Sequence, residues 1–152
     1  MAVTTEEART QILEDLAAAN DQLALAMACL GEAFELLDVM SAETMEDTLY
    51  RPVQKAYGRG KRTHAQFAER VGLPGDVFDP PAAGRTSQGA RAFVERATEA
   101  GAEADRRLAD LQDSMLPIEA GDAELRAGLS EIRELLAEIP TASQRFLSTL
   151  GR

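Results

Sequence analysis

Hydrophobic residues recur at alternating spacings of three and four along most of the chain, which is the pattern of amphipathic helices. Thr4 and Glu7 have the spacing of a capping box, so the first helix is predicted to start there. The inner stripe of this helix has a single polar member, Asn20. Its residues are Leu13, Leu16, Asn20, Leu23, Met27, Leu30, Phe34 and Leu37.

A second helix is predicted to begin at Ser41, whose side chain can cap the first turn. Gly72 and Pro74 are expected to end it. Pro52 either kinks this helix or starts a second segment of it, because proline lacks the amide donor and crowds the preceding turn. The inner stripe of the helix is Val53, Tyr57, Gly60, His64, Phe67 and Val71.

The two remaining helices are predicted to be capped by Ser87 and Asp122. The stripe of the third helix is rich in alanine and consists of Ala90, Phe93, Ala97, Ala100, Ala104, Leu108, Leu111 and Met115. The stripe of the fourth helix consists of Leu125, Leu129, Ile132, Leu136, Ile139, Ser143, Phe146 and Leu150. Because this last stripe continues in phase past Pro140, we expect a kinked helix or two abutting helices there.

The connections between these helices lead to a fold prediction. Segment 73–86 is rich in Pro and Gly and is the one long loop, between the second and third helices, whereas the other connections are short. Long helices of matched length predict an all-α, antiparallel, up-down-up-down four-helix bundle that occupies residues 1–152 as a single domain. A loop of this length can be functional. The plainer expectation is that Val77 and Phe78 plug one end of the core.

The chain of 152 residues is acidic, with a formal net charge of −10. This charge disfavours nucleic acid as a partner, because phosphate contacts need a basic surface. Cys29 is the single cysteine, which leaves no disulfide framework. The first residues lack the pattern of a signal peptide and the apolar run 23–30 is too short to cross a bilayer, so we expect a cytoplasmic protein with no membrane partner. The preference for Arg over Lys, with many alanines, is typical of GC-rich bacterial genomes.

The residue types that support most catalytic and metal chemistry are scarce. His64 is the only histidine, and the inner stripes carry no Asp or Glu. A dinuclear metal site in a helical bundle needs inward carboxylates and a Glu-x-x-His motif on each of two helices. No nucleophilic triad is visible either. We therefore expect no metal, no cofactor and no enzymatic activity.

A few polar or small residues interrupt the inner stripes. Folding the first helix onto the second brings Asn20 to Gly60. Folding the second onto the third brings His64 to Thr98, and folding the third onto the fourth brings Thr98 to Ser143. Such groups beside an alanine-rich helix can form a pocket, although the plainer interpretation is that they set the register of the core. The candidate ligand-binding residues are Asn20, Tyr57, Gly60, His64, Thr98 and Ser143.

One side of the second helix carries a basic run, which consists of Arg51, Lys55, Arg59 and Arg62. This run is a candidate site for an anion or a partner. We favour ion pairs instead, because solvated or paired faces are the common state of such runs. The expected partners are carboxylates on the first and third helices, such as Glu14, Asp21, Glu32 or Glu103.

The expected function is that of a non-catalytic interaction, scaffold or regulatory module, with a protein partner or self-association. The first alternative is a bundle that binds a small apolar or amphiphilic ligand. The second is histidine phosphotransfer through His64. The segment "KRTHAQFAERVG" is similar to the site of histidine-containing phosphotransfer domains, which are also four-helix bundles with one active histidine near basic residues. That family places Lys and Gly shortly after the histidine, where this chain has Phe67 and Ala68.

Overall fold

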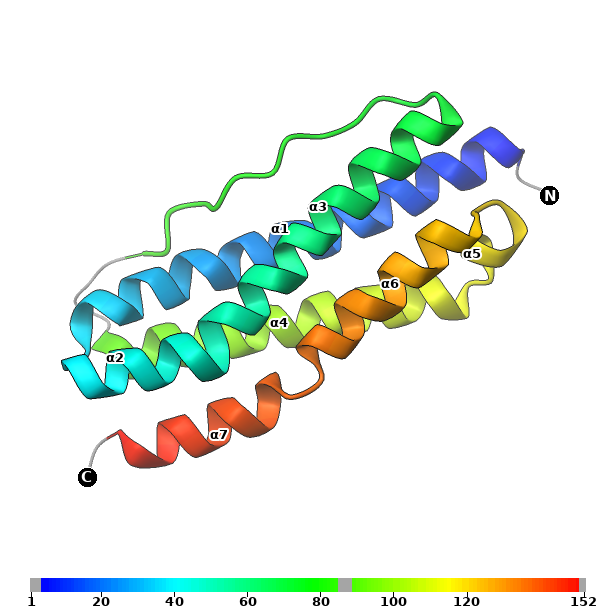
Figure 1. The fold of residues 1–152 in the computed structure, drawn as a ribbon. Helices are drawn as coiled ribbons and strands as arrows, with labels where there is room; N and C mark the ends of the chain where they lie inside the picture. The colour runs from blue at the N-terminus through cyan, green and yellow to red at the C-terminus, as the bar shows by residue number, and fades with distance from the viewer. Residues whose placement is uncertain (1–3, 85–88, 151–152) are drawn as a thin grey trace.

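A computed structural model describes residues 4–84 and 89–150, and within these ranges every regular element is a helix. The all-α prediction is therefore confirmed. The helices are α1 (Thr5–Leu36), α2 (Val39–Met45), η1 (Glu46–Tyr50), α3 (Arg51–Val71), α4 (Gly89–Asp113), α5 (Leu116–Glu119), α6 (Ala123–Leu136) and α7 (Ile139–Thr149). Figure 1 shows them as an elongated bundle with α1, α3, α4 and the α6–α7 pair as its long members.

Two of the predicted caps are confirmed. The Thr4 hydroxyl accepts a hydrogen bond from the amide of Glu7 at 3.1 Å, which starts α1. The Asp122 carboxylate accepts one from the amide of Leu125 at 2.8 Å, which starts α6. These bonds satisfy amides that have no partner within the helix.

The predicted cap at Ser41 is wrong, and Asp38 takes its place. The carboxylate of Asp38 accepts a hydrogen bond from the Ser41 amide at 2.8 Å and another from the Ser41 hydroxyl at 3.0 Å. These bonds also lower the pKa of Asp38, because they stabilise its charged form. The predicted cap at Ser87 lies outside the described residues.

The two prolines inside the predicted helices have different effects. At Pro52 the chain stays helical, because η1, a turn of π-helix, directly precedes it and α2, η1 and α3 follow one another without a break. A π turn shifts the carbonyl that a proline ring would otherwise strike in a regular α-helix. At Pro140 the helix divides: α6 ends at Leu136, and α7 begins at Ile139 with the proline in its first turn. A proline costs no hydrogen bond in that position.

Neighbouring long helices run in opposite directions. Arg59 of α3 pairs with Glu131 of α6, and further along α3 Arg70 pairs with Asp122 at the start of α6. Figure 1 shows the same antiparallel relation between α1 and α3, and between α1 and α4. As a result, α3 and α4 run in the same direction, at diagonal corners of the bundle.

The predicted up-down-up-down order is therefore wrong. After α3, residues 73–84 run back along the length of the bundle, and α4 begins at the same end as α3 (Figure 1). We call these residues the strap. Prolines at 74, 80 and 81 favour an extended chain. Twelve extended residues span up to about 40 Å, which exceeds the roughly 32 Å length of a 21-residue helix such as α3.

The strap is part of the core along its inner side. Phe78 and Ala83 are buried, and the guanidinium of Arg96 on α4 donates a hydrogen bond to the carbonyl oxygen of Ala83. Val77 is 84% exposed, so it does not plug the core as expected. Phe78 packs instead on the side of the bundle, against His64 of α3.

Candidate functional site

The structure brings four of the six candidate ligand-binding residues to the side of the bundle formed by α1 and α3. Asn20 is fully buried in α1 and faces Gly60 of α3, as predicted. A side chain at Gly60 would overlap the Asn20 amide, and its Cβ would lie 3.1 Å from the Asn20 Cγ. Gly60 therefore allows a close approach of the two helices, and the space beside it is filled rather than open.

Several buried polar atoms on this side have no hydrogen-bond partner among the described residues. They are both amide atoms of Asn20, the hydroxyl of Tyr57 and the Nδ1 of His64. Buried polar groups are nearly always paired, because an unpaired one keeps the cost of leaving water. These unpaired buried polar atoms all belong to α1 and α3, so they are grouped on the side of the bundle that these two helices form.

His64 is 3% exposed and lies under the strap. Its ring meets the ring of Phe78 edge-on, with centroids 5.2 Å apart and an interplanar angle of 82°. Burial lowers the pKa of His64 below its usual range, while Asp76 of the strap and the carbonyl of Leu13 oppose that shift. Burial therefore favours the neutral imidazole, which can accept a hydrogen bond at one nitrogen.

Tyr57 lies two helical turns from His64 on the same face of α3. The ammonium of Lys61 stands 4.4 Å from the centroid of its ring, a cation–π contact. Burial raises the pKa of Tyr57, and the carboxylates of Asp79 and Asp21 add to the shift. The phenol therefore stays protonated and keeps its hydrogen-bond donor.

An open groove of about 400 Å³ lies between α1 and the start of the strap. Its lining residues are Thr10, Leu13, Glu14, Ala17, Ala18, Asp21, His64, Leu73, Pro74 and Asp76. The α1 residues form one helical stripe, and the remaining ones come from α3 and the strap. The periodicity of the chain gave no sign of this groove, because it depends on the path of the strap.

Thr98 and Ser143 lie elsewhere, where α4 packs against α7. Their hydroxyl oxygens are 2.6 Å apart, so the predicted contact between them is confirmed. Thr98 also donates to the carbonyl of Val94 at 2.8 Å, which leaves Ser143 as the donor in the shared bond. The expected approach of His64 to Thr98 is wrong, because α3 and α4 occupy diagonal corners.

The basic run of α3 is only partly paired. Arg59 forms an ion pair with Glu131 at 2.8 Å, and Arg51 forms one with Asp47 at 3.2 Å. Lys55 has no carboxylate within 4 Å among the described residues, and the same holds for Arg62.

The expected partners of this run on the first and third helices are wrong. The observed carboxylates come from the preceding helical turn and from α6, the helix that the bundle order places beside α3. Glu103 pairs instead with Arg106 and Arg107 of its own helix. The hydrophobic stripes show which face of each helix is buried but not which helix lies beside it. They therefore could not identify the carboxylates that pair with the basic run.

The largest group of exposed large apolar side chains among the described residues lies where α1 meets α2, and the predicted stripes gave no sign of it. Val39 is 74% and Met40 is 79% exposed, and Phe34 and Leu36 of α1 are also exposed. Phe34 lines a shallow groove of about 280 Å³ beside this surface. A stretch of apolar residues at a turn, where they cannot join the core, is the signal that would have revealed it.

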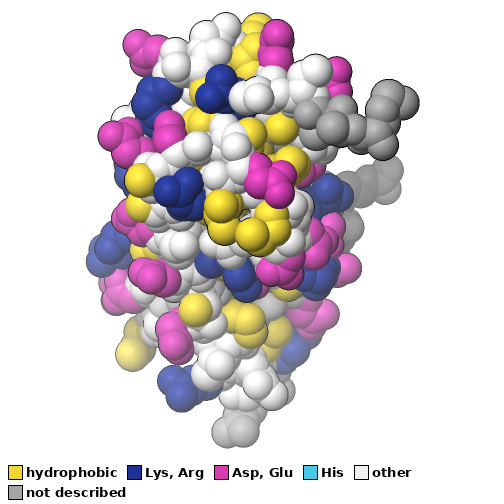
Figure 2. All heavy atoms as spheres, turned by 90° about the vertical axis from the view of Figure 1, so that its right-hand side faces the viewer, with side chains coloured by type: hydrophobic (Ala, Val, Ile, Leu, Met, Phe, Trp, Pro, Cys, Tyr) yellow, Lys and Arg dark blue, Asp and Glu magenta, His cyan; other side chains and the backbone are white. Residues whose placement is uncertain are grey.

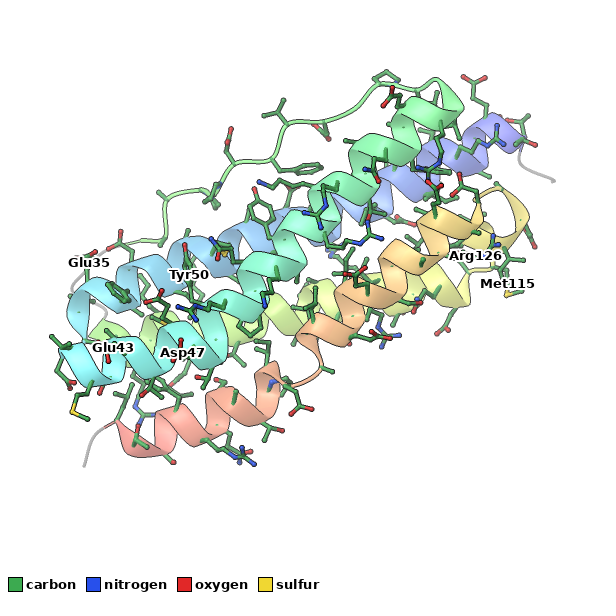
Figure 3. All side chains as sticks on the ribbon, viewed as in Figure 1. Glu35, Glu43, Asp47, Tyr50, Met115 and Arg126 are labelled. Atoms are coloured by element: carbon green, nitrogen blue, oxygen red, sulfur yellow. The ribbon has the colours of Figure 1, made fainter. Side chains whose placement is uncertain are left out.

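Carboxylates flank these apolar residues along the chain. They are Glu32, Glu35, Asp38, Glu43, Glu46 and Asp47, and the sequence has no Lys or Arg between Arg9 and Arg51. We call this end, with its four exposed apolar residues, the acidic tip. Figure 3 shows Glu35, Glu43, Asp47 and Tyr50 together at this end, far from Met115 and Arg126. At the opposite end, acidic, basic and hydrophobic side chains are interspersed (Figure 2).

Other kinds of site find no support in the described part of the chain. Residues 4–84 and 89–150 contain no group of three or more His, Cys, Asp or Glu residues arranged to hold a metal ion. Within the same ranges, no helix has both the length and the apolar character needed to cross a bilayer. Comparisons of the chain with protein-family models, with curated proteins and with solved structures find no match.

Proposed function

We propose that this chain is a non-catalytic interaction module that binds a protein partner through the acidic tip. The observation that carries the proposal is the exposure of Val39 and Met40, 74% and 79%, beside Phe34 and Leu36. Contiguous exposed apolar side chains rimmed by polar ones are typical of protein interaction sites. The long helices behind the tip supply a rigid base for it.

The charge of the acidic tip defines the chemistry of the partner. Six carboxylates lie within residues 32–47, and the nearest base along the chain, Arg51, is engaged with two of them, Glu46 and Asp47. A partner segment with apolar side chains flanked by Lys or Arg would complement this surface. A second copy of the tip would meet it with like charge, which disfavours tip-to-tip self-association.

The groove beside the tip supports the same assignment. Its lining combines the ring of Phe34 and the backbone of Gly31 with Glu35, Glu46 and Tyr50. An apolar side chain of the partner would lie on Phe34, while the glutamates would receive a neighbouring cation. Apolar anchors in shallow pockets with a charged rim are how many such interfaces obtain both affinity and orientation.

Phosphotransfer through His64 is the less favoured alternative. A phosphate donor must reach the ring, whereas His64 is 3% exposed and packed against Phe78. The basic residues nearest to it in sequence, Lys61 and Arg62, are exposed on α3, whereas the ring of His64 is covered. We do not propose this function.

Fluorescence anisotropy tests the assignment with a labelled amphipathic peptide of Leu and Lys, and with its Leu and Glu counterpart. The Lys peptide should bind, and added salt should weaken the complex. The double variant Val39→Ser/Met40→Ser should lose about tenfold in affinity, or about 1.4 kcal/mol. The matched control, Met115→Ser/Ile118→Ser, removes exposed apolar residues at the opposite end and should bind like the wild type. Equal losses in both variants, equal binding of the two peptides, or no binding at millimolar concentration would overturn the proposal.

A further inference from the structure

The groove under the strap is a second feature, independent of the acidic tip. One wall is a single stripe of α1 in which Thr10, Leu13, Glu14, Ala17, Ala18 and Asp21 recur at helical spacing. The other wall is the start of the strap, with Leu73 and Pro74. Because Ala17 and Ala18 stand in the middle of the stripe, the groove keeps open volume where larger side chains would fill it. Its volume, about 400 Å³, falls within the usual range for small-ligand sites.

The charged residues of the groove all have the same sign. Glu14 and Asp21 stand two helical turns apart on α1, and Asp76 stands on the strap. No Lys or Arg is among the lining residues of this groove. The nearby Lys61 is placed over the ring of Tyr57. A surface with carboxylates and no compensating base attracts cations.

These carboxylates do not converge on a point. Within the described residues, no three acidic or imidazole groups are arranged to hold a metal ion. The charged residues instead share the two walls with the apolar residues Leu13, Ala17 and Leu73. That spacing suits a larger cation whose charge is carried by an organic body.

His64 supplies an independent sign of a ligand. Its side chain lines the groove and is almost fully buried, yet its Nδ1 has no partner among the described residues. A neutral imidazole nitrogen without a proton is an acceptor. The Nδ1 has almost no accessible surface, so an N–H of a bound molecule would satisfy it after a small shift of the ring or of the strap. A ligand that carries both a positive charge and N–H donors would therefore match the acids and the histidine together.

We propose that the groove between α1 and the strap binds a small organic ammonium ion with an apolar body, the ammonium facing His64 and the surrounding carboxylates. The alkyl part lies between the walls, against Leu13, Ala17 and Leu73. The strap contributes Asp76 directly and holds Phe78 against the edge of the His64 ring. This assignment does not depend on what binds the acidic tip.

A series of three probes of equal length tests the assignment. Hexylammonium, hexan-1-ol and hexanoate differ in head-group charge and share the same alkyl chain. In heteronuclear NMR titrations of the full chain, hexylammonium should give saturable shifts in the His64 imidazole nitrogens and in the amides of α1 near Leu13 and Ala17. Hexanol should bind about tenfold more weakly, and hexanoate should give no saturable shift. Equal binding of the three probes, or saturation by hexanoate alone, would overturn the proposal.

Two variants with matched controls locate the site. Asp21→Asn/Asp76→Asn should weaken hexylammonium binding at least about fivefold, whereas Asp110→Asn on α4 should leave it unchanged. Ala18→Met should block the groove without changing its charge, whereas Ala127→Met on the exposed face of α6 should not. The same spectra report whether each variant is folded. Unchanged affinity in both site variants, or the absence of saturable shifts in the wild type, would show that the groove is not an ammonium site.

Discussion

Gly60 offers the most direct test of how closely α1 and α3 pack. A methyl group at this position would overlap the Oδ1 of Asn20, and Asn20 is fully buried, so its amide cannot swing into solvent. Replacing Gly by Ala inside a helix gains up to about 1 kcal/mol from backbone propensity. Overpacking a filled interior costs about 1 to 3 kcal/mol. Gly60→Ala should therefore lower the free energy of unfolding by up to about 2 kcal/mol.

Gly58 is the matched control in the same helix. A Cβ there would meet only the exposed Arg62 side chain, at 3.5 Å. Gly58→Ala should thus raise the free energy of unfolding by about 0.5 to 1 kcal/mol. Urea denaturation measures the free energy of unfolding of both variants. The two values can be compared directly when the variants unfold with equal slopes against urea concentration.

A double-mutant cycle shows whether the Asn20 amide causes the loss. Asn20→Ala removes the overlapped atoms together with a buried amide that has no partner, so Asn20→Ala/Gly60→Ala should be more stable than additivity predicts. A coupling energy of about 0.5 to 3 kcal/mol is expected for residues in direct contact. If Gly60→Ala matches Gly58→Ala in stability, or if the coupling is zero, the close approach of α1 and α3 is refuted.

Three further predictions follow from buried positions. Cys29 is fully buried and its pKa is raised by burial, so a thiol reagent should label it slowly in the folded chain and rapidly in urea; fast labelling without urea would contradict this. The folded-state pKa of His64 lies below its usual range, so the unfolded chain binds the proton more readily and stability should fall as the pH drops below about 6.5. His64→Gln should reduce this loss of stability at low pH, measured as the urea midpoint of unfolding. An unchanged pH profile in the variant would contradict the role of His64 in that loss. A Cβ at Gly101 would meet nothing within 4 Å, so Gly101→Ala should raise the unfolding free energy by up to about 1 kcal/mol in thermal melts, whereas a loss would show hidden crowding.

The sequence by itself determined most of the residues that face inward. The predicted inward positions of Phe34 and Met115 are wrong, because both lie near helix ends where no neighbouring helix covers them, and they are exposed. The period of the hydrophobic stripe follows from helical geometry, so Asn20, His64 and Ser143 could be predicted to be buried before any helix was placed. The same reasoning identified contacts between helices joined by a short connection. Residues equidistant from a turn face each other, which accounts for the contacts of Asn20 with Gly60 and of Thr98 with Ser143.

Only the tertiary structure decided how the two helical pairs are joined. A stripe has the same period whether the next helix runs up or down, so it cannot distinguish a tight turn after α3 from a strap that returns along the bundle. The strap places α4 diagonally from α3, separates Thr98 from His64 and selects α6 as the partner of Arg59. It also creates the groove at His64, because a site formed by an extended segment and a helix depends on the path of the chain rather than on a local pattern.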